Sequence, residues 1–469
     1  MWAPQIDFSV LRRELDLPGE FPAEVIAEAE RAAAGTPAGV DRTEVPFVTI
    51  DPAGSQDLDQ AMHLSRRDGG GYRVRYAIAD VASFVRPGGA VEAESWVRGQ
   101  TVYLPDGRIP LHPPVLSEGA VSLFADVERA AVVWTIDLDA DGVTTATHLE
   151  RARVRSRAKL DYPSVQRELA GGNPSELVVL LAEIGTLLAR RAAERGAVNL
   201  PLPAQEVERD GDGWRLVLRA PLPVEEHNAQ ISLLTGMAAA RIMLDGGVGM
   251  LRTMPAPKPE AVAKLRAAAE PLGVHWPAGA TVGAVVASVD PGSPRGAAFL
   301  DQAAELLRGA GYTAFGGSAG PVPEETGHGG VGAPYAHVTA PLRRLADRYV
   351  TETCLALYEN RPVPRWALDA LPRLPKQMST TDRLASAADR GAIDLAEAVL
   401  LHVRVGESFD VAVLDREEAS GKRPAGGTVA LDDPAVRARC VGDLPLGGRV
   451  QARLAVADPA TRTVRFERV

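Results

Sequence analysis

Three closely spaced aspartates are the residues of this sequence best suited to chemistry. Asp51, Asp57 and Asp59 occur in TIDPAGSQDLDQA, where Pro52 and Gly54 turn the chain after an apolar stretch. An extended backbone directs Asp57 and Asp59, two residues apart, to the same side. Carboxylates gathered in one loop repel unless a hard cation lies between them, and such oxygen ligands suit Mg²⁺ or Mn²⁺. The alternative is that these aspartates only form Asx-turns.

A second feature is the alternating basic run ERARVRSRAK. Small or apolar residues separate its five cations, which are Arg151, Arg153, Arg155, Arg157 and Lys159. On a β-strand this alternation places all five charges on one face. A face this basic is a candidate track for a phosphate backbone. The alternative is an ordinary solvated strand face, which charge runs commonly form.

The segment YAHVTAPLRRLADRYV predicts a helix over residues 341–358, with Thr339 or Ala340 as its cap and Pro341 in its first turn. One buried helical face is predicted at Leu342, Leu345, Ala346, Tyr349 and Val350. Arg343 lies off this face and near the helix N-terminus. Free N–H groups, the helix dipole and a guanidinium would meet there and favour a phosphate. The alternative is that Arg343 is an ordinary surface residue.

His337 and Tyr103 each allow a structural and a functional interpretation. His337, just upstream of that helix, is either a strand residue or a ligand-binding one. Tyr103, in VYLPDGRIPL, lies between two apolar stretches that end in proline. A tyrosine in this position suits a hydrophobic core or a platform for stacking a base.

The helices and strands predicted along the chain indicate an α+β protein, and its length suggests two or three domains. Short helices are predicted within residues 1–44, and β-type runs on both sides of the aspartate loop. Helical periodicity dominates residues 175–195 and 230–243. From about residue 401, short β-type runs at regular spacing are typical of a small antiparallel barrel.

Composition narrows the class of protein. The net charge of −10 over 469 residues argues against non-specific coating of nucleic acid, but not against basic residues gathered in one channel. Two cysteines, Cys354 and Cys440, are too few for a disulfide framework and favour a cytoplasmic location. The N-terminus lacks a signal-peptide pattern, and the most apolar stretch, 177–188, contains Glu183. We therefore expect no membrane role.

Taken together, these segments resemble the RNB family, the ribonuclease II and ribonuclease R exoribonucleases. The resemblance is an ordered series: FVTIDPAGSQDLDQAM, YAIADVASFV, RGQTVYLPDGRIPLHPPVLSEGAVSL, RVRSRAKLDY, YAHVTAPLRRLADRY and SAADRGA. VGESFDVAV and LPLGGRVQARL resemble the S1-type OB barrel of the same enzymes. The resemblance implies an RNB catalytic domain at 45–400 and an S1-type RNA-binding domain at 401–469, and the helical pattern of residues 1–44 predicts a short N-terminal module before them.

The family activity that this resemblance implies is processive hydrolysis of single-stranded RNA from its 3′ end, releasing nucleoside 5′-monophosphates. Asp51, Asp57 and Asp59 would hold Mg²⁺, with Mn²⁺ as a substitute, and Asp59 matches the position most critical for catalysis. Tyr103 matches the tyrosine that packs on the 3′-terminal nucleotide, and Arg343 the arginine that clamps the scissile phosphate. Further RNA-binding positions are expected at Arg155, Arg157, His337, Thr339 and Asp389, the last where the family usually has Glu. We expect a monomer.

The sequence departs from the family pattern in several places. Gln60 replaces a fourth acid, so we expect it to contribute a carbonyl oxygen to the cation and cation affinity to be reduced. Leu345 stands where an aromatic residue is usual, and Thr351 where His is usual. Residues 1–44 are too few for the cold-shock-type barrels that longer members carry.

The C-terminal segment has only Phe409 and Phe466 as aromatic residues, and strand alternation is expected to bury both. RNA contacts there would then depend on the basic residues Arg416, Lys422, Arg423, Arg437 and Arg439.

Two other functions stay open. Gln60 suggests an RNA-binding regulator with the RNB fold and a catalytically degenerate site. A metal-dependent phosphomonoesterase fits the aspartates alone, but it leaves the basic strand and the barrel unexplained.

Overall fold

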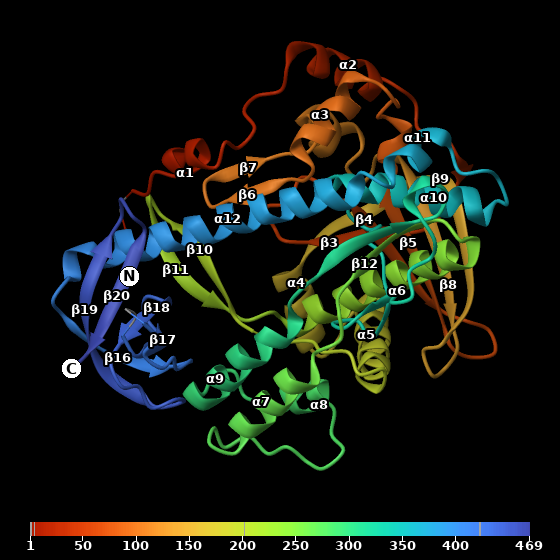
Figure 1. The fold of residues 1–469 in the computed structure, drawn as a ribbon. Helices are drawn as coiled ribbons and strands as arrows, with labels where there is room; N and C mark the ends of the chain where they lie inside the picture. Colours follow the sequence, from red (N-terminus) through yellow and green to blue (C-terminus); the bar gives the residue numbers. More distant parts are fainter. Residues whose placement is uncertain (1, 4, 201, 422–423) are drawn as a thin grey trace.

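A curled six-stranded sheet forms the core of the larger part of the molecule, on the right in Figure 1. The computed structural model describes residues 2–3, 5–200, 202–421 and 424–469. The strand order is β2 (Val40–Asp41), β9 (Thr144–Asp161), β3 (Phe47–Asp51), β4 (Gln60–Arg66), β5 (Tyr72–Ala79) and β8 (Glu128–Leu138). The 18-residue β9 also pairs with β8, so the sheet closes back on itself. The aspartate loop is the connection between β3 and β4.

Helices cover both faces of this sheet. One face packs against α5 (Glu176–Glu194), α6 (Pro223–Gly246) and α10 (Leu345–Tyr358). The other face packs against α2 (Ala23–Ala33), α3 (Ala90–Arg98) and the π-helical turn η2 (Leu116–Ala120). Burial on both sides explains the almost continuous apolar run of β8, because neither face of that strand meets water.

A long helix, α12 (Leu374–Leu401), extends from this core to a closed C-terminal barrel (Figure 1). The barrel strands are β16 (Ser408–Val413), β17 (Gly426–Leu431), β18 (Val436–Val441), β20 (Thr463–Arg468) and β19 (Arg449–Asp458). Phe409 and Phe466 are buried against each other, with ring centroids 5.9 Å apart. The predicted α+β class and C-terminal barrel are confirmed. One pairing, β18 with β20, is parallel rather than antiparallel.

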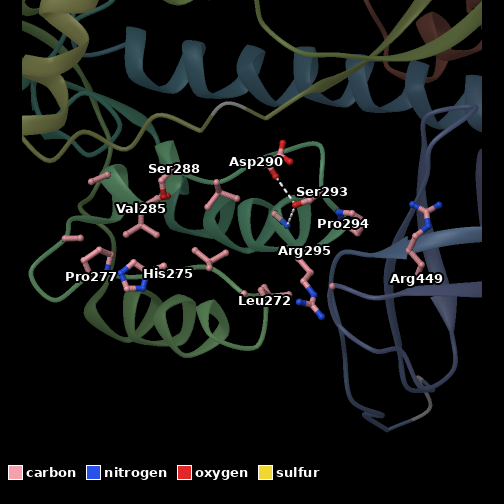
Figure 2. Close-up of a pocket in the computed structure, with 17 residues that line it drawn as sticks. Leu272, His275, Pro277, Val285, Ser288, Asp290, Ser293, Pro294, Arg295 and Arg449 are labelled. Atoms are coloured by element: carbon pink, nitrogen blue, oxygen red, sulfur yellow. Dashed lines mark hydrogen bonds between the residues drawn. The ribbon is translucent and has the colours of Figure 1, made fainter.

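A small helical cluster lies beside the barrel, at the bottom of the molecule in Figure 1. It comprises α7 (Pro259–Ala269), α8 (Val282–Ala287) and α9 (Pro294–Ala304). Arg437 of β18 pairs with Asp301 of α9 at 2.5 Å. A cavity of about 870 Å³ is lined mainly by this helical cluster and bordered by the barrel, and Figure 2 shows Arg295 on the helical side and Arg449 on the barrel. None of the residues singled out in the aspartate loop lines it.

The N-terminal segment is helical, as predicted, with α1 (Ser9–Glu14) preceding α2. It also contributes strands to its neighbours, because β1 (Trp2–Ala3) pairs with β11 (Gly213–Arg219) and β2 pairs with β9. In the described part of the chain, no helix is both long enough and apolar enough to span a membrane.

The helix predicted over 341–358 begins later than expected. α10 starts at Leu345 with Arg344 as its N-cap, and the residues before it form a turn, so the predicted cap at Thr339 or Ala340 is wrong. Two hydrogen bonds hold the residues before the helix in this turn: the N–H of Ala340 donates to Asp347, in the first turn of α10, and that of Leu342 donates to the distant Asp59. All five residues of the predicted buried face are buried, but Leu342 precedes the helix, and α10 is buried on all sides from Leu345 to Ala356 rather than along one face.

Candidate active site

A cavity of about 530 Å³ gathers residues from four separate segments. The β3–β4 loop supplies Asp51, Asp57 and Asp59, as the sequence predicted. The hairpin of β6 (Val102–Leu104) and β7 (Gly107–Ile109) supplies Tyr103, and the turn before α10 supplies Arg343. The rest of the lining consists of Pro52, Gly54, Ser55, Gln60, Arg108 and Tyr162.

Asp59 connects the aspartate loop to the turn that carries Arg343. Its carboxylate is buried and accepts a hydrogen bond of 2.7 Å from the backbone N–H of Leu342. The Nε atom of Arg343 lies 3.8 Å from Asp59 Oδ2. Burial raises the pKa of Asp59 well above its usual value, and the charge of Arg343 opposes this shift. The contact leaves Arg343, whose side chain is 44% exposed, at the open side of the cavity.

Asp57 is held through both carboxylate oxygens. The hydroxyl of Tyr103 donates to Oδ2 at 3.0 Å, and Nη1 of Arg108 donates to Oδ1 at 2.9 Å. Tyr103 and Arg108 are direct partners across the β6–β7 hairpin, which explains why they converge on one carboxylate. Tyr103 is nevertheless 49% exposed, so its ring is still accessible.

Asp51 has an unsatisfied oxygen. Its Oδ2 is buried and has no hydrogen-bond partner. Burial, followed by the charge of Asp57, raises the pKa of Asp51 to about 6, while Lys159 and Arg343 oppose the shift. Lys159 itself donates to the carbonyl oxygens of Ala53 and Ser55, at 3.2 and 2.5 Å. This cation from the basic strand therefore supports the aspartate loop.

Gln60, like Asp59, forms a hydrogen bond to the segment before α10 that carries Arg343. Its Nε2 donates to the carbonyl oxygen of Thr339, and its Oε1 accepts from the hydroxyl of Tyr76 at 3.2 Å. The Thr339 hydroxyl in turn lies 2.8 Å from that of Ser232. One lone pair of Gln60 Oε1 is left for a cation, and its role as a ligand stays a prediction.

The donor set fits a hard divalent cation. Within the residues that the structure describes, no three His, Cys, Asp or Glu side chains already form a metal-binding group. However, the charge of Asp57 raises the pKa of both Asp51 and Asp59, and Asp51 Oδ2 is an orphaned oxygen. A cation relieves this repulsion and takes oxygen ligands of this type. Asp51, Asp57 and Asp59, with Gln60, are the residues that would hold Mg²⁺ or Mn²⁺.

The cations of the basic strand have protein partners. Arg155 lies 3.3 Å from Glu128, and Arg157 donates to the carbonyl oxygen of Thr43 at 2.6 Å. Arg151 pairs with two acids, Asp80 and Glu352. Neither Arg155 nor Arg157 lines the cavity, and their RNA-binding roles stay predictions.

The remaining predicted contacts also lie outside the cavity lining. His337 is half-buried, with Nδ1 2.7 Å from the hydroxyl of Tyr312, and desolvation lowers its pKa well below the usual value. Asp389 is exposed on α12. In the barrel, Arg437 and Arg439 pair with Asp301 and Glu417, and Arg416 is exposed. Lys422 and Arg423 lie outside the described residues. Each of these RNA-binding roles stays a prediction.

The sequence interpretation missed Arg108. The signal was present, because the Pro-Asp-Gly tripeptide between Tyr103 and Arg108 favours a tight turn. A hairpin with that turn pairs Tyr103 directly with Arg108, as the structure shows. Tyr162, at the start of α4 (Tyr162–Ala170), had no comparable signal, since only the end of β9 brings it to the cavity.

Family models match most of the chain. The RNB domain matches residues 40–360, and the RNase II-type exonuclease C-terminal S1 domain matches residues 407–469. This chain belongs to the RNB-domain family. Ribonuclease R of Escherichia coli is 27% identical over 416 residues, which cover 81% of this chain and 48% of that protein. The chain thus spans about half the length of such curated relatives.

Solved structures share the same RNB fold. The apo form of Mycoplasma genitalium RNase R matches with a TM-score of 0.83 at 18% identity, covering 100% of this chain and 78% of that one. Yeast Ssd1, described as a pseudonuclease, matches with a TM-score of 0.70 at 18% identity, covering 95% of this chain and 54% of that one. The RNB fold therefore occurs in proteins with and without nuclease activity.

Proposed function

We propose that this chain is a magnesium-dependent exoribonuclease that hydrolyses single-stranded RNA processively from the 3′ end, releasing nucleoside 5′-monophosphates. The observation that carries this proposal is the single cavity that unites three aspartates with Arg343 and Tyr103. Carboxylates, a guanidinium and an accessible aromatic ring are the groups needed to cleave a phosphodiester at a stacked terminal nucleotide. Membership of the RNB family supports the same conclusion.

Each residue has a role that its contacts support. When bound, a divalent cation supplies a water of lowered pKa and positive charge at the reacting phosphate. The exposed guanidinium of Arg343, only 3.8 Å from Asp59, is placed to bind the scissile phosphate. The half-exposed ring of Tyr103 offers a stacking surface for the last base. Buried Asp59 is shielded from bulk water, which strengthens its electrostatic interactions.

RNA as the ligand is supported by a relative and by the barrel. Mycoplasma genitalium RNase R has been solved with single-stranded and with double-stranded RNA. The C-terminal S1 domain has both phenylalanines buried, so its RNA contacts depend on charge rather than base stacking. We expect affinity for RNA to fall steeply with added salt.

The test is incubation of the full chain with 5′-labelled single-stranded RNA and Mg²⁺. We expect the label to pass from full-length RNA to a short end product with few intermediates, while nucleoside 5′-monophosphates accumulate. A 3′-phosphorylated mononucleotide serves as the control substrate, because a phosphomonoesterase would release its phosphate. Intact RNA under conditions where the protein binds it would contradict the proposal. A duplex with a 3′ overhang, followed over time, reports how far degradation enters paired RNA.

A second candidate is an RNA-binding regulator that retains the RNB fold without the chemistry. Two observations favour it: Gln60 replaces an acid and has both ends of its amide engaged, and the pseudonuclease Ssd1 shares this fold. Such a protein would retard labelled RNA in a gel without shortening it.

A further inference from the structure

Arg108 introduces a positive charge into the acidic cavity. Its Nη1 donates to Asp57 Oδ1 at 2.9 Å, and its Nε donates to Glu118 Oε1 at the same distance. Its side chain is 22% exposed, so solvent only partly screens its charge. The guanidinium is therefore held between Asp57, which lines the cavity, and Glu118, which does not.

The β6–β7 hairpin keeps Arg108 in this position. Arg108 pairs across the hairpin with Tyr103, whose hydroxyl holds the second oxygen of Asp57. At the hairpin turn, Asp106 forms two hydrogen bonds with Arg12 of α1, at 2.9 and 2.5 Å. Glu118 belongs to the π-helical turn η2, a type of turn that often occurs at functional sites.

We propose that Arg108 is a positioning residue that sets the divalent-cation affinity of the cavity. The proposal rests on the proposed function, because it takes the aspartate cavity to be the cation site. Arg108 lowers this affinity in two ways. A cation must share the Asp57 carboxylate with the guanidinium, and the fixed positive charge repels a second positive charge nearby. Glu118 partly neutralises Arg108 and so limits the repulsion.

The electrostatic role and a merely structural role predict different signs. Removing the charge of Arg108 leaves Asp57 free for the cation, so affinity rises. Removing the charge of Glu118 leaves Arg108 less neutralised, so affinity falls. If the bridge from Asp57 through Arg108 to Glu118 only maintained the loop geometry, both changes would disorder the site and both would weaken cation binding.

The experiment is a titration of the full chain with Mn²⁺ in the absence of RNA, with free Mn²⁺ measured by electron paramagnetic resonance. We expect Arg108→Gln to bind Mn²⁺ at least about threefold more tightly than the wild type, and Glu118→Gln at least about threefold more weakly. Arg108→Lys retains the charge and should restore near wild-type affinity. Arg241→Gln is the control, because this arginine is 78% exposed on α6, lines no part of the aspartate cavity and should leave affinity unchanged when its charge is removed.

Thermal unfolding of each variant confirms that it is folded before titration. If the wild type binds Mn²⁺ and Arg108→Gln binds it equally or more weakly, the proposed role of Arg108 is overturned. The proposed function still stands in that case. If the wild type binds no Mn²⁺, the cation site of the proposed function fails and this inference fails with it.

Discussion

The side-chain amide of Gln60 donates a hydrogen bond to the backbone carbonyl of Thr339, which lies 279 residues later in the chain. This bond, with the one from Leu342 N–H to Asp59, fastens the turn that carries Arg343 onto the aspartate loop. Gln60 is thus a structural link as well as a candidate cation ligand. A carboxylate in its place could offer a charge to the cation but could not donate to a carbonyl oxygen.

We therefore expect Gln60→Asp to have two opposite effects. The added charge should move the Mg²⁺ activation curve to lower concentration, since each carboxylate adds to cation affinity. The maximal rate should fall, because the turn carrying Arg343 loses the Thr339 contact. The measurement is initial rate against free Mg²⁺ for both proteins, with Mn²⁺ as a second cation. A curve that stays in place would show that position 60 is outside the cation shell.

Asp59→Asn should abolish cleavage and leave the fold intact. The amide oxygen of asparagine can still accept from Leu342 N–H, so the variant removes the charge and keeps the contact. Cleavage and RNA binding are measured side by side, and Asp443→Asn, at an exposed carboxylate of the barrel, is the control. A variant that retains more than roughly a tenth of the wild-type rate would contradict a role in cation and water activation.

Arg343→Ala should lower the rate at saturating RNA by at least about tenfold, because a guanidinium that stabilises developing charge on a phosphoryl group contributes several kcal/mol. The control is Arg241→Ala, which removes an arginine that is 78% exposed on α6. Single-turnover kinetics separate binding from cleavage. A change confined to RNA affinity would show that Arg343 is only a surface contact.

Two substitutions at Tyr103 separate its two contacts. Tyr103→Phe keeps the ring and loses the hydrogen bond to Asp57, so the end product should keep its length. Tyr103→Ala removes the stacking surface and should leave a longer or more heterogeneous residual oligonucleotide. Sequencing gels of exhaustive digests give the product lengths. If both variants leave the wild-type product, another residue sets the limit.

The raised pKa of Asp51 leads to a prediction of how the stability of the cation-free protein depends on pH. Its pKa is about 6 in the folded protein, above the value of roughly 4 for an unfolded chain. Between these values the folded state binds more protons, so the free energy of unfolding falls as pH rises. Asp51→Asn removes this loss. In EDTA it should therefore unfold at a higher temperature than the wild type at pH 7.5, and at a similar temperature near pH 4.

Addition of Mg²⁺ completes this test by thermal denaturation. It should raise the unfolding temperature of the wild type more than that of Asp51→Asn, because a ligand stabilises the state that binds it. If the difference in unfolding temperature between Asp51→Asn and the wild type is the same at pH 4 and pH 7.5, the charge of Asp51 is not the cause of that difference.

Local patterns predicted much of the fold because they reflect local physical constraints. Strand alternation and helical periodicity identified β3, β5, α5, α10 and every barrel strand except β18, including the burial of Phe409 and Phe466. The helix start near Arg343 could not be predicted in this way. The turn before it is held by a hydrogen bond from Leu342 N–H to Asp59, a residue 283 positions earlier that a local pattern cannot indicate as a partner.

By itself, the sequence determined which chemical groups are present: three aspartates in one loop, Arg343 outside the predicted apolar helix face, and Tyr103 in a segment bounded by prolines. Only the tertiary structure decided which charged side chains pair with other parts of the protein and which line the cavity. Arg155 and Arg157 have partners on neighbouring segments, whereas Arg108 enters the cavity and holds Asp57. The physical reason is that a charge acts through its distances to other charges, and folding alone brings distant segments within those distances.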